Sequence, residues 1–228
     1  MSEFFVITGT KKEAACFEDY TVGIGHKVLC SGARVIRLTS IMQQEIQNGY
    51  CALLSFGLAG GLVNDLAPGT LVIPSKITDK TGSSRSVDRE TRNILIDTLE
   101  DNNIGWVDRL VCGVNKPLTM PAEKEALHRA INAHVVDMES HVAGEIAERV
   151  GIPWLVIRAI ADHASDSVPQ TATESVMENG AISSKKLLKG SFRRPSEIPA
   201  LITLARNSIT GLNTLRRVVP LFLSCHPL

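Results

Sequence analysis

Short apolar runs recur along this 228-residue chain, and most of them are followed by turn residues and then by a helical pattern. Runs of this length suit strands buried on both faces, and strands separated by helices are typical of parallel pairing through crossover connections. The chain therefore predicts an α/β fold with a mostly parallel sheet between layers of helices. The expected strands are Phe4–Ile7, Val28–Cys30, Cys51–Phe56, Leu71–Ile73, Trp106–Cys112, His134–Val136 and Trp154–Ile157.

Three other segments carry apolar residues at helical spacing. The stripes in Arg34–Gln47 and Glu139–Val150 predict amphipathic helices that cover the sheet. From Ser196 onward, a further stripe predicts a final helix that packs on the domain and ends in the apolar segment Val218–Leu223. The members of this last stripe are Ile198, Leu201, Ile202, Leu204, Ala205, Ile209 and Leu212.

The stretch between Asp79 and Arg92 reads DKTGSSRSVDRETR, which is polar and rich in turn residues. It predicts a surface loop, and a plain solvated loop is favoured over part of a pocket rim. No linker rich in Pro, Gly or Ser divides the chain, so residues 1–228 are expected to form one domain.

The charge balance favours a small-molecule partner. Lys and Arg number 24 and Asp and Glu also 24, so the formal net charge is zero. A neutral chain lacks the usual electrostatic attraction to nucleic acid or to an anionic membrane. The start of the sequence lacks a secretory signal and no run of about 18 apolar residues occurs, so we expect a cytoplasmic protein without a transmembrane segment.

The cysteines and histidines give no sign of a metal or redox centre. The cysteines are odd in number and scattered without a CxxC pair, so reduced core thiols are expected. The six histidines lack an HxxxH or HExxH arrangement, so no metal site is expected. The cysteines are Cys16, Cys30, Cys51, Cys112 and Cys225.

Acidic residues follow three of the expected strands, at Glu13, Glu139 and Asp162. Ligands of α/β folds gather at the carboxyl ends of strands, so these side chains are candidates for an active site. Each also has an ordinary explanation. Glu13 would complement a helix dipole, Glu139 or Asp137 would cap a helix, and Asp162 would cap a turn or pair with Arg158. His163, next to Asp162, is expected to be an ordinary pocket or surface histidine.

The stretch SFGLAGG, from Ser55 to Gly61, places three glycines after an expected strand. It lacks the spacing of a GxGxxG motif or a P-loop, so a cradle for nucleotide phosphates is not supported. Two roles for these glycines remain open: they could form a tight turn where the chain leaves the strand, or they could form a wall against a ribose or an anion.

Taken in order, the segments GTKKE, SFGLAGGL with LAPGTLVIP, VVDMES and GIPWLVIRAIADHASD resemble the purine nucleoside phosphorylase and methylthioadenosine/S-adenosylhomocysteine nucleosidase superfamily. The resemblance covers about residues 4–166. The tail GSFRRPSEIPALITLARNSITGLNTLRR looks most like the hopanoid-associated phosphorylase branch, which is thought to remove adenine from adenosylhopane. The resemblance implies a three-layer α/β sandwich whose central mixed sheet curls toward a barrel, and a homodimer or higher homo-oligomer.

The resemblance also assigns roles to single residues. Asp162 stands where the family keeps the acid that protonates the purine ring, and Glu13 matches the glutamate that activates water. Glu139 and Met138 match the residues that hold the ribose, and Gly60 matches a glycine lying against the substrate. No cofactor is implied, and water or inorganic phosphate is the co-substrate.

Two departures concern phosphate binding. Leu58 replaces the serine of the family's GSAGG pattern, and the arginine that phosphorolytic members place just before it is missing. Gly32 and Arg34 are candidate phosphate-binding residues, and a solvated surface role for Arg34 and Arg37 is favoured over this one. Phosphorolysis and hydrolysis therefore both remain open.

The leading interpretation is an enzyme that releases adenine from a lipid-linked adenosyl derivative such as adenosylhopane. An ordinary methylthioadenosine or adenosylhomocysteine nucleosidase is the second interpretation, and a small pocket in place of a long groove would distinguish it. A non-catalytic nucleoside-binding protein is the third. A purely structural subunit would leave the three acidic residues scattered.

Overall fold

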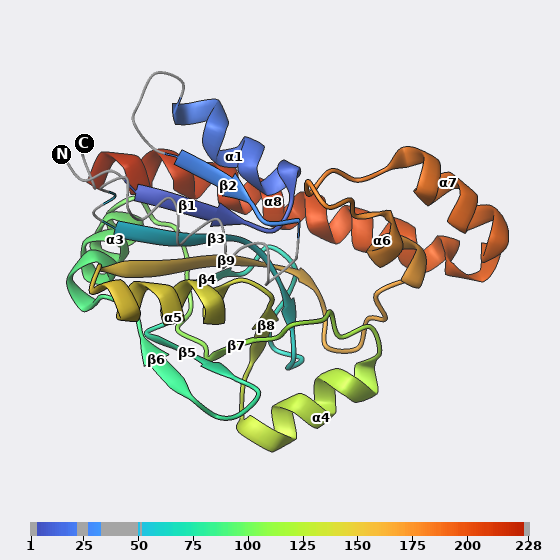
Figure 1. Cartoon of the computed structure of the whole chain (residues 1–228), viewed down its shortest axis with the longest axis horizontal. Helices are drawn as coiled ribbons and strands as arrows, with labels where there is room; N and C mark the ends of the chain where they lie inside the picture. Colours follow the sequence, from blue (N-terminus) through green and yellow to red (C-terminus); the bar gives the residue numbers. More distant parts are fainter. Residues whose placement is uncertain (1–3, 22–26, 33–49, 51, 226–228) are drawn as a thin grey trace.

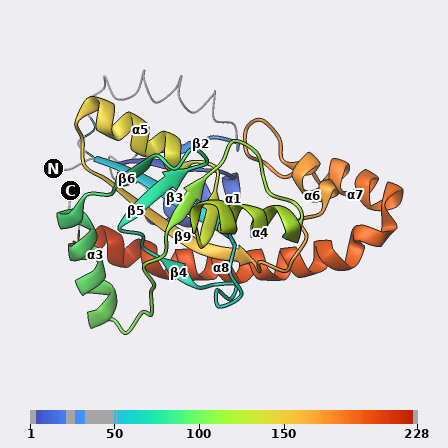
Figure 2. The ribbon, with the colours of Figure 1, turned by 90° about the horizontal axis from the view of Figure 1, so that it is seen from below.

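The structure, a computed structural model, describes residues 4–21, 27–32, 50 and 52–225. Within these residues, nine strands form one mixed sheet, with α5 on one face and α8 on the other (Figures 1 and 2). The strands are β1 (Phe4–Thr8), β2 (Lys27–Cys30), β3 (Ala52–Gly61), β4 (Leu71–Val72), β5 (Lys76–Asp79), β6 (Ser84–Ser86), β7 (Val111–Gly113), β8 (Val135–Asp137) and β9 (Trp154–Asp162).

The helices of the described residues lie around this sheet, and α6 and α7 project with the start of α8 from one end of the molecule (Figure 1). They are α1 (Lys11–Thr21), α3 (Arg89–Asp101), α4 (Pro121–Ile131), α5 (Ser140–Val150), α6 (Gln170–Ser175), α7 (Ser184–Arg193) and α8 (Ile198–Cys225), with a 3₁₀ turn at Pro195–Glu197 before α8.

Strand β3 holds the sheet together because it has three neighbours. It pairs in parallel with β9 over most of its length, and its first part pairs in parallel with β1 on the other side. Its last two residues, Gly60 and Gly61, pair antiparallel with β8. β8 continues through β7 and β5 to the edge strand β6. The expected mixed sheet flanked by helices is confirmed, and the sheet is not closed into a barrel among the described residues.

The apolar runs predicted most of the sheet. All of β9 is buried, as is most of β3, because each is covered on both faces. The segment expected as Trp106–Cys112 is a strand only from Val111 to Gly113. The expected helix Arg34–Gln47 and Cys51 lie outside the described residues. The other four cysteines are free thiols, but only Cys16 and Cys112 are buried as core thiols, whereas Cys30 and Cys225 are partly exposed.

The expectation of a loop from Asp79 to Arg92 is wrong in part. The stretch contains strand β6 and the start of α3. β6 is an edge strand whose two serines are exposed, so it forms through backbone pairing with β5 and leaves no apolar pattern. The Asp79 carboxylate accepts hydrogen bonds from the backbone N–H groups of Thr81 and Ser83, which stabilise the turn between the two strands.

The final helix forms as expected, but its first half does not pack as expected. Ile198, Ile202 and Ile209 are 40%, 49% and 55% exposed. Burial begins at Gly211 and continues to Phe222, so only the second half of α8 covers the sheet. Helical spacing predicts a stripe, but it does not say whether a partner surface lies beneath the stripe. No helix among the described residues is long and apolar enough to cross a membrane.

Candidate active site

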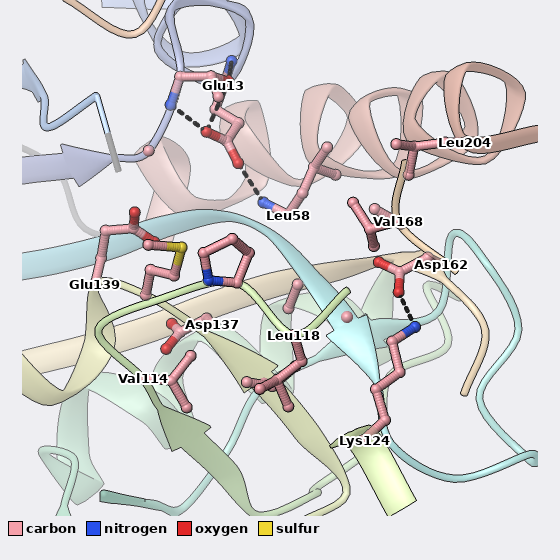
Figure 3. A pocket seen from close by; sticks show the side chains of 18 residues that line it. Glu13, Leu58, Val114, Leu118, Lys124, Asp137, Glu139, Asp162, Val168 and Leu204 are labelled. Atoms are coloured by element: carbon pink, nitrogen blue, oxygen red, sulfur yellow. Dashed lines mark hydrogen bonds and ion pairs between the residues drawn. The ribbon is translucent and has the colours of Figure 1, made fainter. Parts of the chain in front are cut away.

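A cavity of about 270 Å³ lies where β3, β8 and β9 end (Figure 3). It is lined by Glu13, Glu139 and Asp162, three carboxylates that come from segments far apart in the sequence. Met138 and Gly60, the other two residues expected to contact substrate, line it as well. The three acidic residues therefore converge, and they do not scatter as they would in a purely structural subunit.

Glu13 lies in the first turn of α1 and has a local role as well as a place in the cavity. Its Oε2 accepts hydrogen bonds from the Thr10 N–H (2.5 Å) and the Thr10 hydroxyl (2.8 Å), which fixes the start of the helix. Its Oε1 accepts from the Leu58 N–H of β3 (2.7 Å). Burial raises the pKa of Glu13, and these hydrogen bonds oppose the rise. The expected helix-end role is thus present without excluding a chemical one.

Two acidic residues lie near the end of β8, and one of them, Asp137, stabilises the start of α5. Its carboxylate accepts hydrogen bonds from the Ser140 N–H (3.2 Å) and the Ser140 hydroxyl (2.7 Å). Glu139 stands at the N-cap position but makes no capping hydrogen bond with its side chain. Because Asp137 takes the capping role, the Glu139 carboxylate is left to face the cavity.

Glu139 sits in a buried environment with few donors. The Ser31 hydroxyl donates to its Oε1 (3.4 Å), and Nη2 of Arg158 lies 3.7 Å from its Oε2. Burial raises the pKa of Glu139 to about 7, and the Arg158 charge opposes that rise. A carboxyl with this pKa changes its charge near neutral pH.

Arg158 is fully buried beneath the site. Its Nη2 forms an ion pair with Asp137 (2.5 Å) and donates to the Ser55 hydroxyl (2.6 Å). The charge of Arg158 lowers the pKa of both Glu13 and Glu139. The pairing of Arg158 with Asp162, one of the two ordinary roles considered for Asp162, does not occur, because Arg158 pairs with Asp137 instead.

Two glycines of the SFGLAGG stretch give the charged groups room. A Cβ at Gly57 would lie 2.7 Å from Oε1 of Glu13 and 2.9 Å from Nη1 of Arg158. A Cβ at Gly60 would lie 3.3 Å from both carboxylate oxygens of Asp162. Both glycines lie within β3 itself, so they permit close approach of side chains and do not form a tight exit from the strand.

Sequence reasoning missed Lys124, which lies on α4 and is fully buried against Asp162. Its ammonium group donates to Asp162 Oδ2 and to the backbone carbonyls of His163 (2.6 Å) and Asp166 (3.0 Å), so three acceptors surround its three protons. Burial raises the pKa of Asp162, and the Lys124 charge opposes the rise. The signal was present, since Lys124 falls on the same helical stripe as Leu127 and Ile131.

The capping role considered for Asp162 falls to Asp166, whose Oδ2 accepts from the His163 N–H (3.0 Å). His163 itself is half-buried and its side chain does not line the cavity.

The described residues provide no structural support for the candidate phosphate site at Gly32 and Arg34. Gly32 lies outside the cavity lining, with its Cβ position blocked 2.2 Å away by the Glu178 carbonyl, and Arg34 lies outside the described residues.

The sequence profile of the phosphorylase superfamily matches residues 26–190, which is most of the chain. The chain belongs to this superfamily. It is therefore an enzyme of the nucleoside phosphorylase and N-glycosidase type, as the sequence motifs implied. The resemblance to the hopanoid-associated branch remains a prediction. The comparison with curated proteins gives no match.

Solved structures share the fold at low sequence identity. A Helicobacter pylori methylthioadenosine/adenosylhomocysteine nucleosidase mutant, with 5′-methylthioadenosine in its active site, is 14% identical with a TM-score of 0.70, covering 96% of this chain and 99% of its own. Streptococcus pyogenes S-adenosylhomocysteine nucleosidase is 14% identical with a TM-score of 0.73, and the match covers 100% of this chain and 98% of the nucleosidase. Helicobacter pylori futalosine hydrolase is 16% identical with a TM-score of 0.66, and the match covers 85% of this chain and 98% of the hydrolase.

Proposed function

We propose that this enzyme releases adenine from an adenosyl derivative by cleaving its N-glycosidic bond, and that the substrate carries a lipid at its 5′ position, as adenosylhopane does. The observation that carries the proposal is the convergence of three buried carboxylates, all with a raised pKa, on one cavity. Related folds belong to nucleosidases whose names include 5′-methylthioadenosine and S-adenosylhomocysteine.

Asp162 is the proposed acid. A carboxyl must be protonated to donate, and burial favours the protonated form by raising the pKa of Asp162. The proton passes to a ring nitrogen of the purine, so the base leaves as a neutral molecule. The carboxylate that remains lies beside the Lys124 ammonium group, which stabilises its negative charge. Lys124 is therefore a positioning residue that stabilises Asp162 after proton transfer.

Glu139 is proposed to hold the ribose hydroxyls, and Met138 to line the sugar face. As the bond to the base stretches, the sugar gains positive charge. The ionised Glu139 carboxylate interacts more favourably with this charge than with the neutral ground state, so it accelerates the reaction. Arg158 supports this role because its charge favours the ionised form of Glu139.

Glu13 is proposed to activate water, and the described lining of the cavity favours hydrolysis over phosphorolysis. Lys124 is the one cation among the described residues that line the cavity, and its three protons already have acceptors. A phosphate dianion there would also face four carboxyl groups, because Asp137 lines the cavity together with Glu13, Glu139 and Asp162. Water meets no such repulsion, and an ionised Glu13 can accept its proton as it attacks the sugar carbon.

A nucleosidase for a small thioether nucleoside is the second candidate. The observation that favours it is the size of the cavity, because about 270 Å³ is small beside typical ligand pockets of roughly 300–1,000 Å³. Such a cavity holds the nucleoside part of either substrate. The two candidates differ in whether the 5′ substituent extends out of it. The homo-oligomeric state and the cytoplasmic location remain predictions.

The test measures adenine release from adenosylhopane and from 5′-methylthioadenosine, each with and without phosphate, by the wild type and by Asp162→Asn. We expect release that needs no phosphate, yields the free sugar and is lost in the variant. Release that requires phosphate and yields a sugar phosphate would replace hydrolysis with phosphorolysis. Release from neither substrate would overturn the proposal in favour of a nucleoside-binding protein.

A further inference from the structure

Helix α7 and the residue after it concentrate positive charge that the neutral balance of the whole chain conceals. Residues 179–196 contain five cations and no acidic residue. They are Lys185, Lys186, Lys189, Arg193 and Arg194. Arg194 pairs with Glu174 of α6 (3.0 Å), and the other four side chains are exposed.

The same helix exposes large apolar side chains. Leu188 is 62% exposed and Phe192 is 80% exposed, and the spacing of four residues puts them on one stripe of α7. The opposite side of the helix is docked on the protein at Gly190, where a Cβ would lie 2.5 Å from Cγ2 of Thr171. The stripe therefore faces outward, and α7 lies in the part of the molecule that projects away from the sheet (Figures 1 and 2).

Cations border the apolar stripe directly. Lys185 and Lys189 stand three residues before and one residue after Leu188, which places them in the neighbouring row of the helix surface. An outward apolar stripe bordered by lysines is the pattern of helices that lie in the interface of an anionic membrane. The apolar side chains enter the boundary between headgroups and acyl chains, and the lysines remain at the level of the phosphates.

We propose that α7 is a docking surface for an anionic phospholipid bilayer. A second copy of the chain fits this surface less well, because a symmetric contact would bring the cations of two α7 helices together. An RNA backbone would use the cations but would leave Leu188 and Phe192 in water. The bilayer is the occupant that matches both the charge and the apolar side chains.

The position of α7 gives the docking a consequence for catalysis, which rests on the proposed function. The 3₁₀ turn Pro195–Glu197 leads from α7 into α8, and Leu204 of α8 lines the cavity. Ile198 and Ile202, on the turns of α8 between α7 and Leu204, are exposed. An adenosyl lipid held in the bilayer would thus meet apolar side chains between the membrane and the cavity.

The test measures cosedimentation of the full chain with vesicles of phosphatidylcholine alone, and of phosphatidylcholine and phosphatidylglycerol in equal parts. We expect binding to the anionic vesicles and a loss of at least about twentyfold in Lys185→Glu/Lys189→Glu, since each basic residue near the surface contributes about fivefold. Phe192→Ser keeps the charge and should weaken binding about tenfold. Lys76→Glu/Arg149→Glu, which reverses two exposed cations elsewhere, should stay within about twofold of the wild type.

The proposal is overturned if the wild type does not bind anionic vesicles, or if the control pair loses as much affinity as the α7 pair. It is also overturned if sedimentation shows that the α7 variants change the oligomeric state, or if the wild type prefers a single-stranded RNA to the vesicles at the same salt. No nucleoside is present in this test, so its outcome is separate from that of the proposed reaction. In a separate activity assay, the Lys185→Glu/Lys189→Glu variant should release adenine from soluble 5′-methylthioadenosine at the same rate as the wild type.

Discussion

Two regions of this protein gather charged side chains under opposite conditions. At the cavity, Glu13, Glu139 and Asp162 are buried beside the buried cations Lys124 and Arg158. On α7, Lys185 and its neighbouring cations are exposed to solvent. Burying a charge costs several kcal/mol unless a partner compensates it, whereas an exposed charge costs little. The difference indicates that the cavity charges are retained for chemistry, and that the α7 charges are retained for a partner outside the molecule.

The largest effect should come from removing the deepest cation. Arg158→Met leaves the Asp137 carboxylate buried without its ion-pair partner, so we expect the free energy of unfolding to fall by about 3–5 kcal/mol. Urea denaturation measures it. The matched control is Arg129→Met, whose side chain is exposed and should change stability by less than about 0.5 kcal/mol. Equal effects of the two substitutions would remove the distinction between buried and exposed charge.

Glu139→Gln keeps the shape of the side chain and removes the charge. We expect kcat to fall by about 10²–10³, because the variant loses an interaction made mainly in the transition state. The pKa of about 7 also predicts that wild-type kcat/KM rises with pH through neutrality as Glu139 ionises, and that this rise is absent in the variant. Steady-state kinetics across pH checks both. A variant with altered KM and unchanged kcat would assign Glu139 to binding alone.

Glu139 should also make stability depend on pH. Burial raises its pKa from 4.5 to about 7 in the folded protein, so the folded state binds the proton more tightly than the unfolded state. The contribution to stability is therefore fully present below pH 4.5 and is lost as pH rises to about 7, by at most about 3 kcal/mol. Denaturation of wild type and Glu139→Gln across this range measures it. A parallel dependence in both proteins would show that Glu139 does not carry it.

Lys124→Met tests the cation beside the proposed acid. Its loss removes the charge that lowers the pKa of Asp162, so the pH at which activity declines should shift upward. We expect kcat to fall by about 10–100-fold, because the carboxylate formed on proton transfer loses its stabilising partner. Lys124→Arg should recover part of the rate and the original pH profile. An unchanged profile in Lys124→Met would leave the lysine a structural role only.

The smallest effect should come from α7. Lys185→Glu/Lys189→Glu alters only exposed side chains, so the free energy of unfolding should change by less than about 0.5 kcal/mol. Thermal denaturation measures this directly. A large loss of stability would show that these lysines hold the fold together, and the vesicle results would then have to be interpreted again.

The sequence was informative where burial leaves a pattern. The apolar runs predicted β1, β3 and β9, and the order of the motifs predicted that Glu13, Glu139 and Asp162 would meet. Strand β6 was not predicted, because an exposed edge strand pairs through its backbone and needs no apolar side chains.

Partner choice could not be read from the sequence. Spacing along the chain does not show that Arg158 forms its ion pair with Asp137 rather than with Asp162. It also does not show that Lys124 of α4 pairs with Asp162, which lies 38 residues later in the sequence. These pairs depend on how distant segments pack. For the same reason, the stripe at the start of α8 predicted a helix correctly and its packing wrongly.

The most direct test of the account follows one substitution with two readouts. Asp162→Asn should still bind 5′-methylthioadenosine by calorimetry, because Glu139, Met138 and the cavity walls remain, while adenine release should fall by at least about 10². Retained binding with lost release would identify Asp162 as the acid of an N-glycosidic cleavage. Release at the wild-type rate would contradict the account, since the bond would then break without the carboxyl on which the mechanism depends.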